Sequence, residues 1–135
     1  MKDIRIKDFK VNEEAKVVVG TGLFDTQLET DMEHSQAPGK IRELVTALDN
    51  LFIGTPFHKV KVKARCDERD AFDWKRGKDI CNSKLECKRH MKLARKYDRV
   101  YRMMCEALPY VEERVRTHLG KAQAIQEDLG SMYRE

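Results

Sequence analysis

Residues 58–80 read HKVKVKARCDERDAFDWKRGKDI, and this stretch decides the fold. From His58 to Cys66 it alternates apolar and basic side chains, the period-two pattern of a strand with one exposed face. An acidic turn follows, and Asp73 is placed to cap a helix that begins at Trp74. The stretch therefore predicts a strand, a corner and the start of a helix.

The exposed face of this strand is strongly basic. Its four cations are Lys59, Lys61, Lys63 and Arg65. Lysines on an edge strand hinder pairing with other chains, whereas a row of cations also attracts anionic partners. Both roles stay open from the sequence.

A long amphipathic helix is predicted from Trp74 onward, because apolar residues recur at helical spacing and no proline occurs before Pro109. One row repeats every seven residues, and a second row runs beside it. The first comprises Ile80, Cys87, Ala94, Tyr101 and Leu108, and the second comprises Leu93, Tyr97, Val100 and Met104.

Pro109 is expected to kink or end this helix, because proline removes a backbone donor and clashes with the preceding turn. An apolar stripe continues beyond it, with Gly120 and Gly130 as candidate helix stops. We therefore predict a helical hairpin or one kinked helix over residues 73–129. Because such a helix is far longer than average, we expect it to pack against another chain in a homo-oligomer.

The first 66 residues predict a small antiparallel sheet with one short helix. Residues 15–20 are rich in valine and end at Gly20-Thr21-Gly22, which we interpret as a hairpin turn. An earlier strand is predicted at residues 4–11. Apolar spacing indicates a helix at residues 40–52, and the polar residues 26–39 predict a loop.

These elements define an α+β protein in a single domain, residues 1–135. Residues 1–66 form its strand-rich part, with the short helix near residues 40–52, and residues 73–129 form its helical part. The predicted architecture is a small antiparallel sheet packed with that helix, followed by the long helical segment.

The net charge of the chain is +4, yet eleven basic and three acidic residues between Lys75 and Arg102 give that segment a net charge of +8. Such a block points to an anionic partner, which is a nucleic acid, a nucleotide or an acidic protein face. No apolar run predicts a membrane helix and the N-terminus has no signal-peptide pattern, so we expect a cytoplasmic protein.

The sequence shows none of the residue patterns that are typical of common catalytic and metal-binding sites. The chain lacks phosphate-loop, dinucleotide-binding, zinc-protease and serine-hydrolase motifs. Its four cysteines, at positions 66, 81, 87 and 105, lack zinc-ligand spacing and are expected as free, buried or half-buried thiols. We expect no enzyme activity, no cofactor and no metal.

Aromatic and basic residues form a more informative combination. Phe72 lies at the predicted corner, while Arg95, Arg99 and Arg102 share one helical surface at spacings of four and three. Arginines in such a row can bind phosphate through paired hydrogen bonds, and an aromatic face can stack on a base. A solvated helix face beside an aromatic core corner fits the same residues.

The pattern C-x-x-x-D-x-F-D-x-x-x-G from Cys66 to Gly77, between a strand and a helix, resembles a corner of small phage and prophage proteins of Gram-positive hosts. From Lys59 onward, the chain resembles the Thoeris anti-defence sponge family. Members of that family bind a cyclic ADP-ribose signal of a bacterial immune system and sequester it intact. They assemble as oligomers from a small sheet and long C-terminal helices.

The resemblance implies a phage protein, in the host cytoplasm, that sequesters a cyclic nucleotide without cleaving it. It implies Phe72 as a base-stacking aromatic, with Asn82 and Arg99 as polar contacts. If the family needs a second arginine at the position of Met103, this chain departs from the family pattern there. Arg102 is then the residue that could take its place. The candidate ligand-binding residues are Arg65, Phe72, Asn82, Arg95, Arg99 and Arg102.

Two other functions remain open. The basic helix from Lys75 to Arg102 suits a nucleic-acid-binding module, although no recognised reader motif accompanies it. The same helix also suits an inhibitor or assembly factor directed at another protein.

Overall fold

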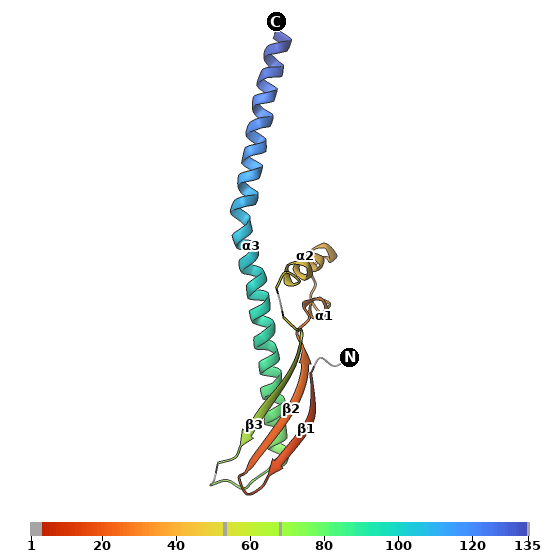
Figure 1. Cartoon of the computed structure of the whole chain (residues 1–135), viewed down its shortest axis with the longest axis vertical. Coiled ribbons are helices and arrows are strands. Elements are labelled where there is room, and N and C mark those ends of the chain that lie inside the picture. The colour runs from red at the N-terminus through yellow and green to blue at the C-terminus, as the bar shows by residue number, and fades with distance from the viewer. Residues whose placement is uncertain (1–3, 53, 68, 135) are drawn as a thin grey trace. The chain divides into compact units, whose positions relative to one another are not determined.

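The computed structural model describes residues 4–52, 54–67 and 69–134. Its elements are β1 (Ile4–Asn12), β2 (Val17–Asp25), α1 (Leu28–Met32), α2 (Gly39–Asp49), β3 (Phe57–Arg65) and α3 (Trp74–Arg134) (Figure 1). The chain forms two compact units that meet within α3, the first ending at Asp98 and the second starting at Arg99. The predicted α+β class is confirmed.

The three strands form one antiparallel sheet in the order β1-β2-β3. Asn12 pairs with Val17 across the first turn, where Lys16 takes a left-handed backbone with φ of 54°. The predicted turn at Gly20-Thr21-Gly22 is wrong, because these residues pair with β3 in the middle of β2. Both glycines are buried, as expected where another backbone approaches a strand closely.

The helix-facing side of the sheet forms the core of the first unit. Its central cluster consists of Val18, Phe24, Val62, Ala64, Cys81 and Leu85, with Phe9, Val60 and Phe72 packed around it. The Cys81 thiol donates to the Val18 carbonyl at 3.5 Å, which brings α3 close to β2. A methyl group at Gly77 would lie 2.5 Å from Val18 Cγ2, so only glycine fits this close approach.

The buried residues on the inner face of α3 recur every four positions from Gly77 to Leu93. They are Gly77, Cys81, Leu85, Arg89 and Leu93, all buried. The predicted row at Ile80, Cys87, Ala94, Tyr101 and Leu108 is exposed along its whole length. From the second predicted row, Leu93 and Val100 are buried. The heptad row therefore does not form the core, and the inner face of the helix is a different one.

β3 is an edge strand, and its lysine face is exposed as predicted. The Cys66 amide donates to the Lys16 carbonyl, and the Thr26 amide donates to the Pro56 carbonyl. In this pattern the backbone N–H and C=O groups of the even-numbered residues of β3 point toward β2, and those of the odd-numbered residues point away from it. The carbonyls of Lys61 and Lys63 therefore point to the open edge. Two lysines of α3 cover them, with Lys84 Nζ 2.5 Å from the Lys63 oxygen and Lys88 Nζ 3.4 Å from the Lys61 oxygen.

The predicted loop over residues 26–39 is wrong in part, because it contains α1. This short helix forms since Leu28 and Met32, four residues apart, are both buried. The predicted helix at residues 40–52 is confirmed as α2.

A polar cluster joins this end of the sheet to α3 within the first unit. Lys96 Nζ donates to the Thr26 carbonyl at 2.6 Å and lies 3.5 Å from the Asp49 carboxylate. Tyr97 donates its hydroxyl proton to Asp31 at 2.5 Å. Burial raises the pKa of Tyr97, and its bond to Asp31 raises that pKa further. The cluster ties α1 and α2 to the long helix.

In the second unit, α3 continues through Pro109 to Arg134. Of the two predicted alternatives, a hairpin and one helix kinked at Pro109, the chain therefore forms a single helix, and the predicted stops at Gly120 and Gly130 are wrong. Pro109 occupies an exposed position, where its cost is limited to the lost hydrogen bond and the local clash, about 3 kcal/mol. The glycines also lie within the helix, and a side chain at either would meet nothing within 4 Å.

Candidate functional site

A pocket of about 520 Å³ lies where β3 turns into α3. We call it the corner pocket. Its walls come from the end of β3, the loop over residues 66–73 and the first two turns of α3, and Val18 of β2 contributes to its floor. It therefore forms on the pattern C-x-x-x-D-x-F-D-x-x-x-G that leads from the strand into the helix.

The loop beside the corner pocket is held by its own polar groups. Lys16 Nζ donates to the Asp70 carbonyl at 2.7 Å, and the Cys66 thiol lies 3.7 Å from the Ala71 carbonyl. The Asp67 carboxylate accepts a hydrogen bond from the Arg69 amide at 3.0 Å. These bonds connect the described loop residues, 66–67 and 69–73, to one another and to Lys16.

The predicted helix cap at Asp73 is confirmed. Its carboxylate accepts hydrogen bonds from the amides of Lys75 at 3.0 Å and Arg76 at 3.3 Å. An anionic ligand in the corner pocket therefore meets an N-terminus of α3 that already has its negative partner. Charge recognition in this pocket falls to the side chains.

The corner pocket combines an aromatic side chain, two cations and an apolar floor. Phe72 is half-buried against the core, while Arg65 and Arg76 are exposed on the wall. The floor includes Val18 and Gly77, which pack directly against each other. The carboxylates of Asp67, Asp70 and Asp73 line the same pocket, so its wall carries both signs of charge.

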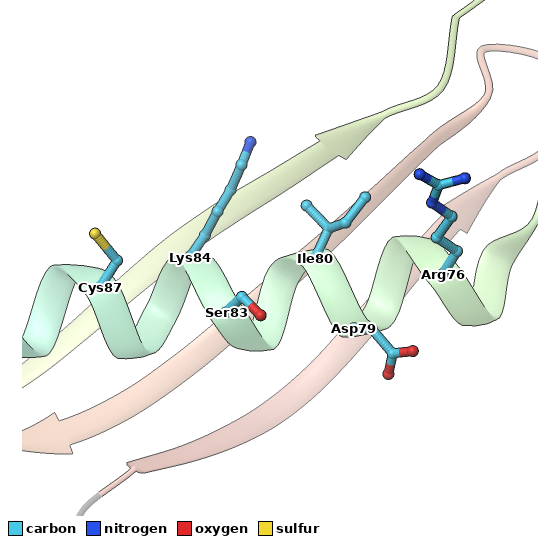
Figure 2. Close-up of a pocket in the computed structure, with 6 residues that line it drawn as sticks. All are labelled: Arg76, Asp79, Ile80, Ser83, Lys84 and Cys87. Atoms are coloured by element: carbon cyan, nitrogen blue, oxygen red, sulfur yellow. The ribbon is translucent and has the colours of Figure 1, made fainter.

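A shallower groove of about 340 Å³ adjoins the corner pocket on the outer face of α3. Figure 2 shows Arg76, Ile80, Lys84 and Cys87 projecting along one side of the helix, with Asp79 and Ser83 flanking them. Arg76 and Ile80 line both the groove and the corner pocket. Arg76 is therefore the cation that links the two concave surfaces.

The structure brings two of the six predicted ligand residues together, since Arg65 and Phe72 both line the corner pocket. Asn82 and Arg95 are exposed on α3 and lie outside the lining of both pockets. Arg99 and Arg102 lie in the second unit, where their side chains are exposed.

Sequence reasoning missed Arg76. The signal that locates it is its position four residues before Ile80 and one before the buried Gly77, which places it on the rim of the first turn.

Much of the basic segment holds the fold together. Besides the two edge lysines and Lys96, Arg89 is buried and its Nε lies 3.3 Å from the Asp25 carbonyl. Lys78 Nζ lies 4.5 Å from the centre of the Trp74 ring and 5.0 Å from that of Phe9, within cation–π range. The net charge of the segment therefore overstates the positive surface that is offered to a ligand.

The four cysteines are free, as predicted, but only Cys81 is buried and Cys66 half-buried, whereas Cys87 and Cys105 are exposed. Among the residues that the structure describes, no group of three or more His, Cys, Asp or Glu side chains is placed to hold a metal ion. No helix in the described part of the chain has both the length and the apolarity to cross a membrane. Comparisons with protein-family models, curated proteins and solved structures gave no match.

Proposed function

We propose that the corner pocket binds a cyclic nucleotide and that the protein sequesters this signal, a cyclic ADP-ribose derivative or a cyclic oligonucleotide, without cleaving it. The observation that carries the proposal is Phe72 beside Arg65 and Arg76 around one apolar floor. The pocket volume of about 520 Å³ suits a small-molecule ligand. A phage anti-defence role follows if the ligand is an immune signal.

Each side chain of the corner pocket has a matching group on a nucleotide. The Phe72 ring offers a face on which a base can stack, and the two arginines offer paired donors to phosphate oxygens. The carboxylates of Asp67 and Asp70 are acceptors suited to ribose hydroxyls. A ligand with a base, phosphates and riboses therefore uses both signs of charge in the wall.

Binding without cleavage is supported by the hydrogen bonds that polar side chains of the pocket make to the protein backbone. The Asp73 carboxylate caps α3, and the Asp67 carboxylate closes a turn. The Cys66 thiol lies beside the carbonyls of its own loop. Asp73, Asp67 and Cys66 therefore each help to hold the backbone that forms the pocket.

The test is a thermal-shift and calorimetry screen of the full chain against cyclic ADP-ribose isomers and cyclic dinucleotides. A ligand at one hundred times its Kd stabilises the folded state by about 2.7 kcal/mol. After heat denaturation, mass spectrometry of the released ligand should recover it intact. Absence of binding across the panel refutes the proposal, and recovery of a cleaved product refutes sequestration.

Variants assign the binding to the pocket. Phe72→Ala and Arg76→Ala should each weaken binding about tenfold or more, since each removes a direct contact. Lys59→Ala is the matched control, because Lys59 is an exposed cation of β3 outside the pocket lining. If all three variants bind equally well, the ligand occupies another site.

Nucleic-acid binding is a second candidate, favoured by an exposed aromatic among cations. Trp74 is 42% exposed, and Lys75 Nζ lies 5.7 Å from its ring centre. A gel shift at low salt tests this function, with binding expected to weaken steeply as salt rises. Trp74→Ala should abolish such binding and leave cyclic nucleotide binding in the corner pocket unchanged.

A further inference from the structure

The second unit carries an exposed apolar stripe with a period of seven. Between Met104 and Met132, two rows alternate at spacings of four and three, in the manner of a coiled-coil seam. We call these nine positions the heptad stripe. They are Met104, Leu108, Val111, Val115, His118, Ala122, Ile125, Leu129 and Met132.

All nine positions except His118 are apolar. Apart from Met104, which is half-buried, every one of these side chains is exposed, up to 68% at Met132.

The residues that oppose helix formation avoid the heptad stripe. Pro109, Gly120 and Gly130 all fall on positions that face away from it. An apolar row of a straight helix drifts by about 20° per heptad, so a strict period of seven follows one seam only when two helices supercoil. The heptad stripe therefore indicates that this helix packs against a second helix whose apolar residues also repeat every seven positions.

The rest of this chain offers no such helix within the described residues. α1 has 5 residues and α2 has 11, whereas the heptad stripe extends over four heptads. A helix that contains a proline and two glycines is marginal in water without packing along its apolar face. The segment with a matching stripe is the same segment of a second copy.

We infer that two copies of this chain form an antiparallel coiled coil through the heptad stripe, centred on Gly120. Eight of the nine positions are then matched, because each position from Leu108 to Met132 meets a position of the other row. Met104 lies beyond the paired region. Across the interface the pairs are Leu108 with Met132, Val111 with Leu129, Val115 with Ile125, and His118 with Ala122. The larger His118 thus meets the smallest side chain of the stripe.

Charge complementarity favours this direction. In the antiparallel pairing, Arg114 of each copy flanks Asp128 of the other, which gives two ion pairs of opposite charge. In a parallel pairing, Arg114 would flank Leu119 and Asp128 would flank Tyr133, with no ion pair. The two Lys121 side chains approach each other at the centre, where their length lets them extend into water.

The area is sufficient for a specific dimer. A fully covered aliphatic side chain removes on the order of 100 Å² from water, and roughly half of that is already covered in a single helix. The stripe then contributes roughly 400 Å² per copy, and the stems of flanking side chains bring the total for two copies near the 1,000 Å² of a specific interface. This dimer does not depend on the corner pocket.

Light scattering of the full chain tests the dimer. We expect twice the chain mass of 15.8 kDa for the protein, and 15.8 kDa for Val115→Glu, which places a charge in the seam. Gln123→Glu, an equal change on the outward face, should stay dimeric. A protein of 15.8 kDa at its highest soluble concentration overturns the inference, as does a dimer that Val115→Glu leaves intact.

Charge reversal tests the direction of pairing. Arg114→Asp should weaken the dimer at low salt, because two aspartates then face each other, and so should Asp128→Arg. The double variant should recover the affinity of the unmodified chain, since both ion pairs are restored with reversed sign. A double variant no tighter than either single variant overturns the antiparallel arrangement.

Discussion

Replacing Gly77 by alanine should destabilise the first unit, although alanine is the better helix former. The added methyl would lie 2.5 Å from Val18 Cγ2 and 3.1 Å from Val18 Cβ. Val18 is fully buried and its β-branched side chain has one preferred rotamer, so it cannot turn aside. The clash must be relieved by moving α3 away from the sheet.

The magnitude follows from two opposing effects. Overpacking of a dense core costs about 1–3 kcal/mol, and a contact this short belongs at the upper end. Alanine regains about 1 kcal/mol of helix propensity relative to glycine. We therefore expect Gly77→Ala to lower the free energy of unfolding by about 2 kcal/mol.

Urea unfolding followed by the fluorescence of Trp74, the single tryptophan, measures this change. With a slope of about 2 kcal/mol per molar, the midpoint should fall by roughly 1 M. Gly120→Ala is the matched control, because its methyl would meet nothing within 4 Å and helicity should rise.

The double variant of Gly77→Ala with Val18→Ala should lose less stability than the two single variants together, because the smaller Val18 position admits the methyl. A midpoint for Gly77→Ala at or above that of the unmodified protein would refute the close packing of α3 on β2.

Three further predictions concern burial and charge. Burial lowers the pKa of His58, and the nearby lysines lower it further. As the pH decreases below 6.5, the unfolded chain therefore takes up the His58 proton before the folded protein does, and the free energy of unfolding should decrease. The variant His58→Gln should lose this part of the pH dependence. Burial raises the pKa of the Cys81 thiol, so thiol reagents should modify Cys87 in the folded protein and reach Cys81 only on unfolding, which mass spectrometry can follow. Leu85→Ala should cost about 2–5 kcal/mol in urea unfolding, while Ile80→Ala on the exposed row should cost less than about 1 kcal/mol; equal losses would contradict the assigned inner face of α3.

The sequence predicts the elements of the first unit wherever local chemistry and packing agree. The alternation from His58 to Cys66 survives as β3, and Asp73 caps α3 as its position indicates. Gly20 and Gly22 mislead, because a glycine pair between apolar residues signals a turn locally. Both lie buried inside β2, and predicting this requires knowledge of which strand face the helix covers.

The inner face of α3 illustrates the same limit. Two apolar rows are visible in the sequence, and the more regular one, through Ile80 and Cys87, is exposed. The buried row includes Gly77 and Arg89, which carry no apolar signal. Its selection depends on contacts with β2, such as those of Gly77 and Cys81 with Val18, which lies far away in the sequence.

Part of the candidate site follows from the motif at the corner. Phe72 and Arg65 flank the turn in sequence, so their meeting in the corner pocket needs only the strand, the loop and the first helical turn. Arg95 lies five turns farther along α3, and spacing on a helix face alone does not bring it to the same pocket.

The two lysines that cover the outer carbonyls of β3 make the sheet finite on that side. A β-sheet grows by adding strands at an open edge, and here the acceptors of Lys61 and Lys63 are already bonded to Lys84 and Lys88. These bonded acceptors therefore hinder the addition of a further strand at the β3 edge. Replacing Lys84 and Lys88 with alanine would remove both donors and leave the two carbonyls open to the amides of an incoming strand.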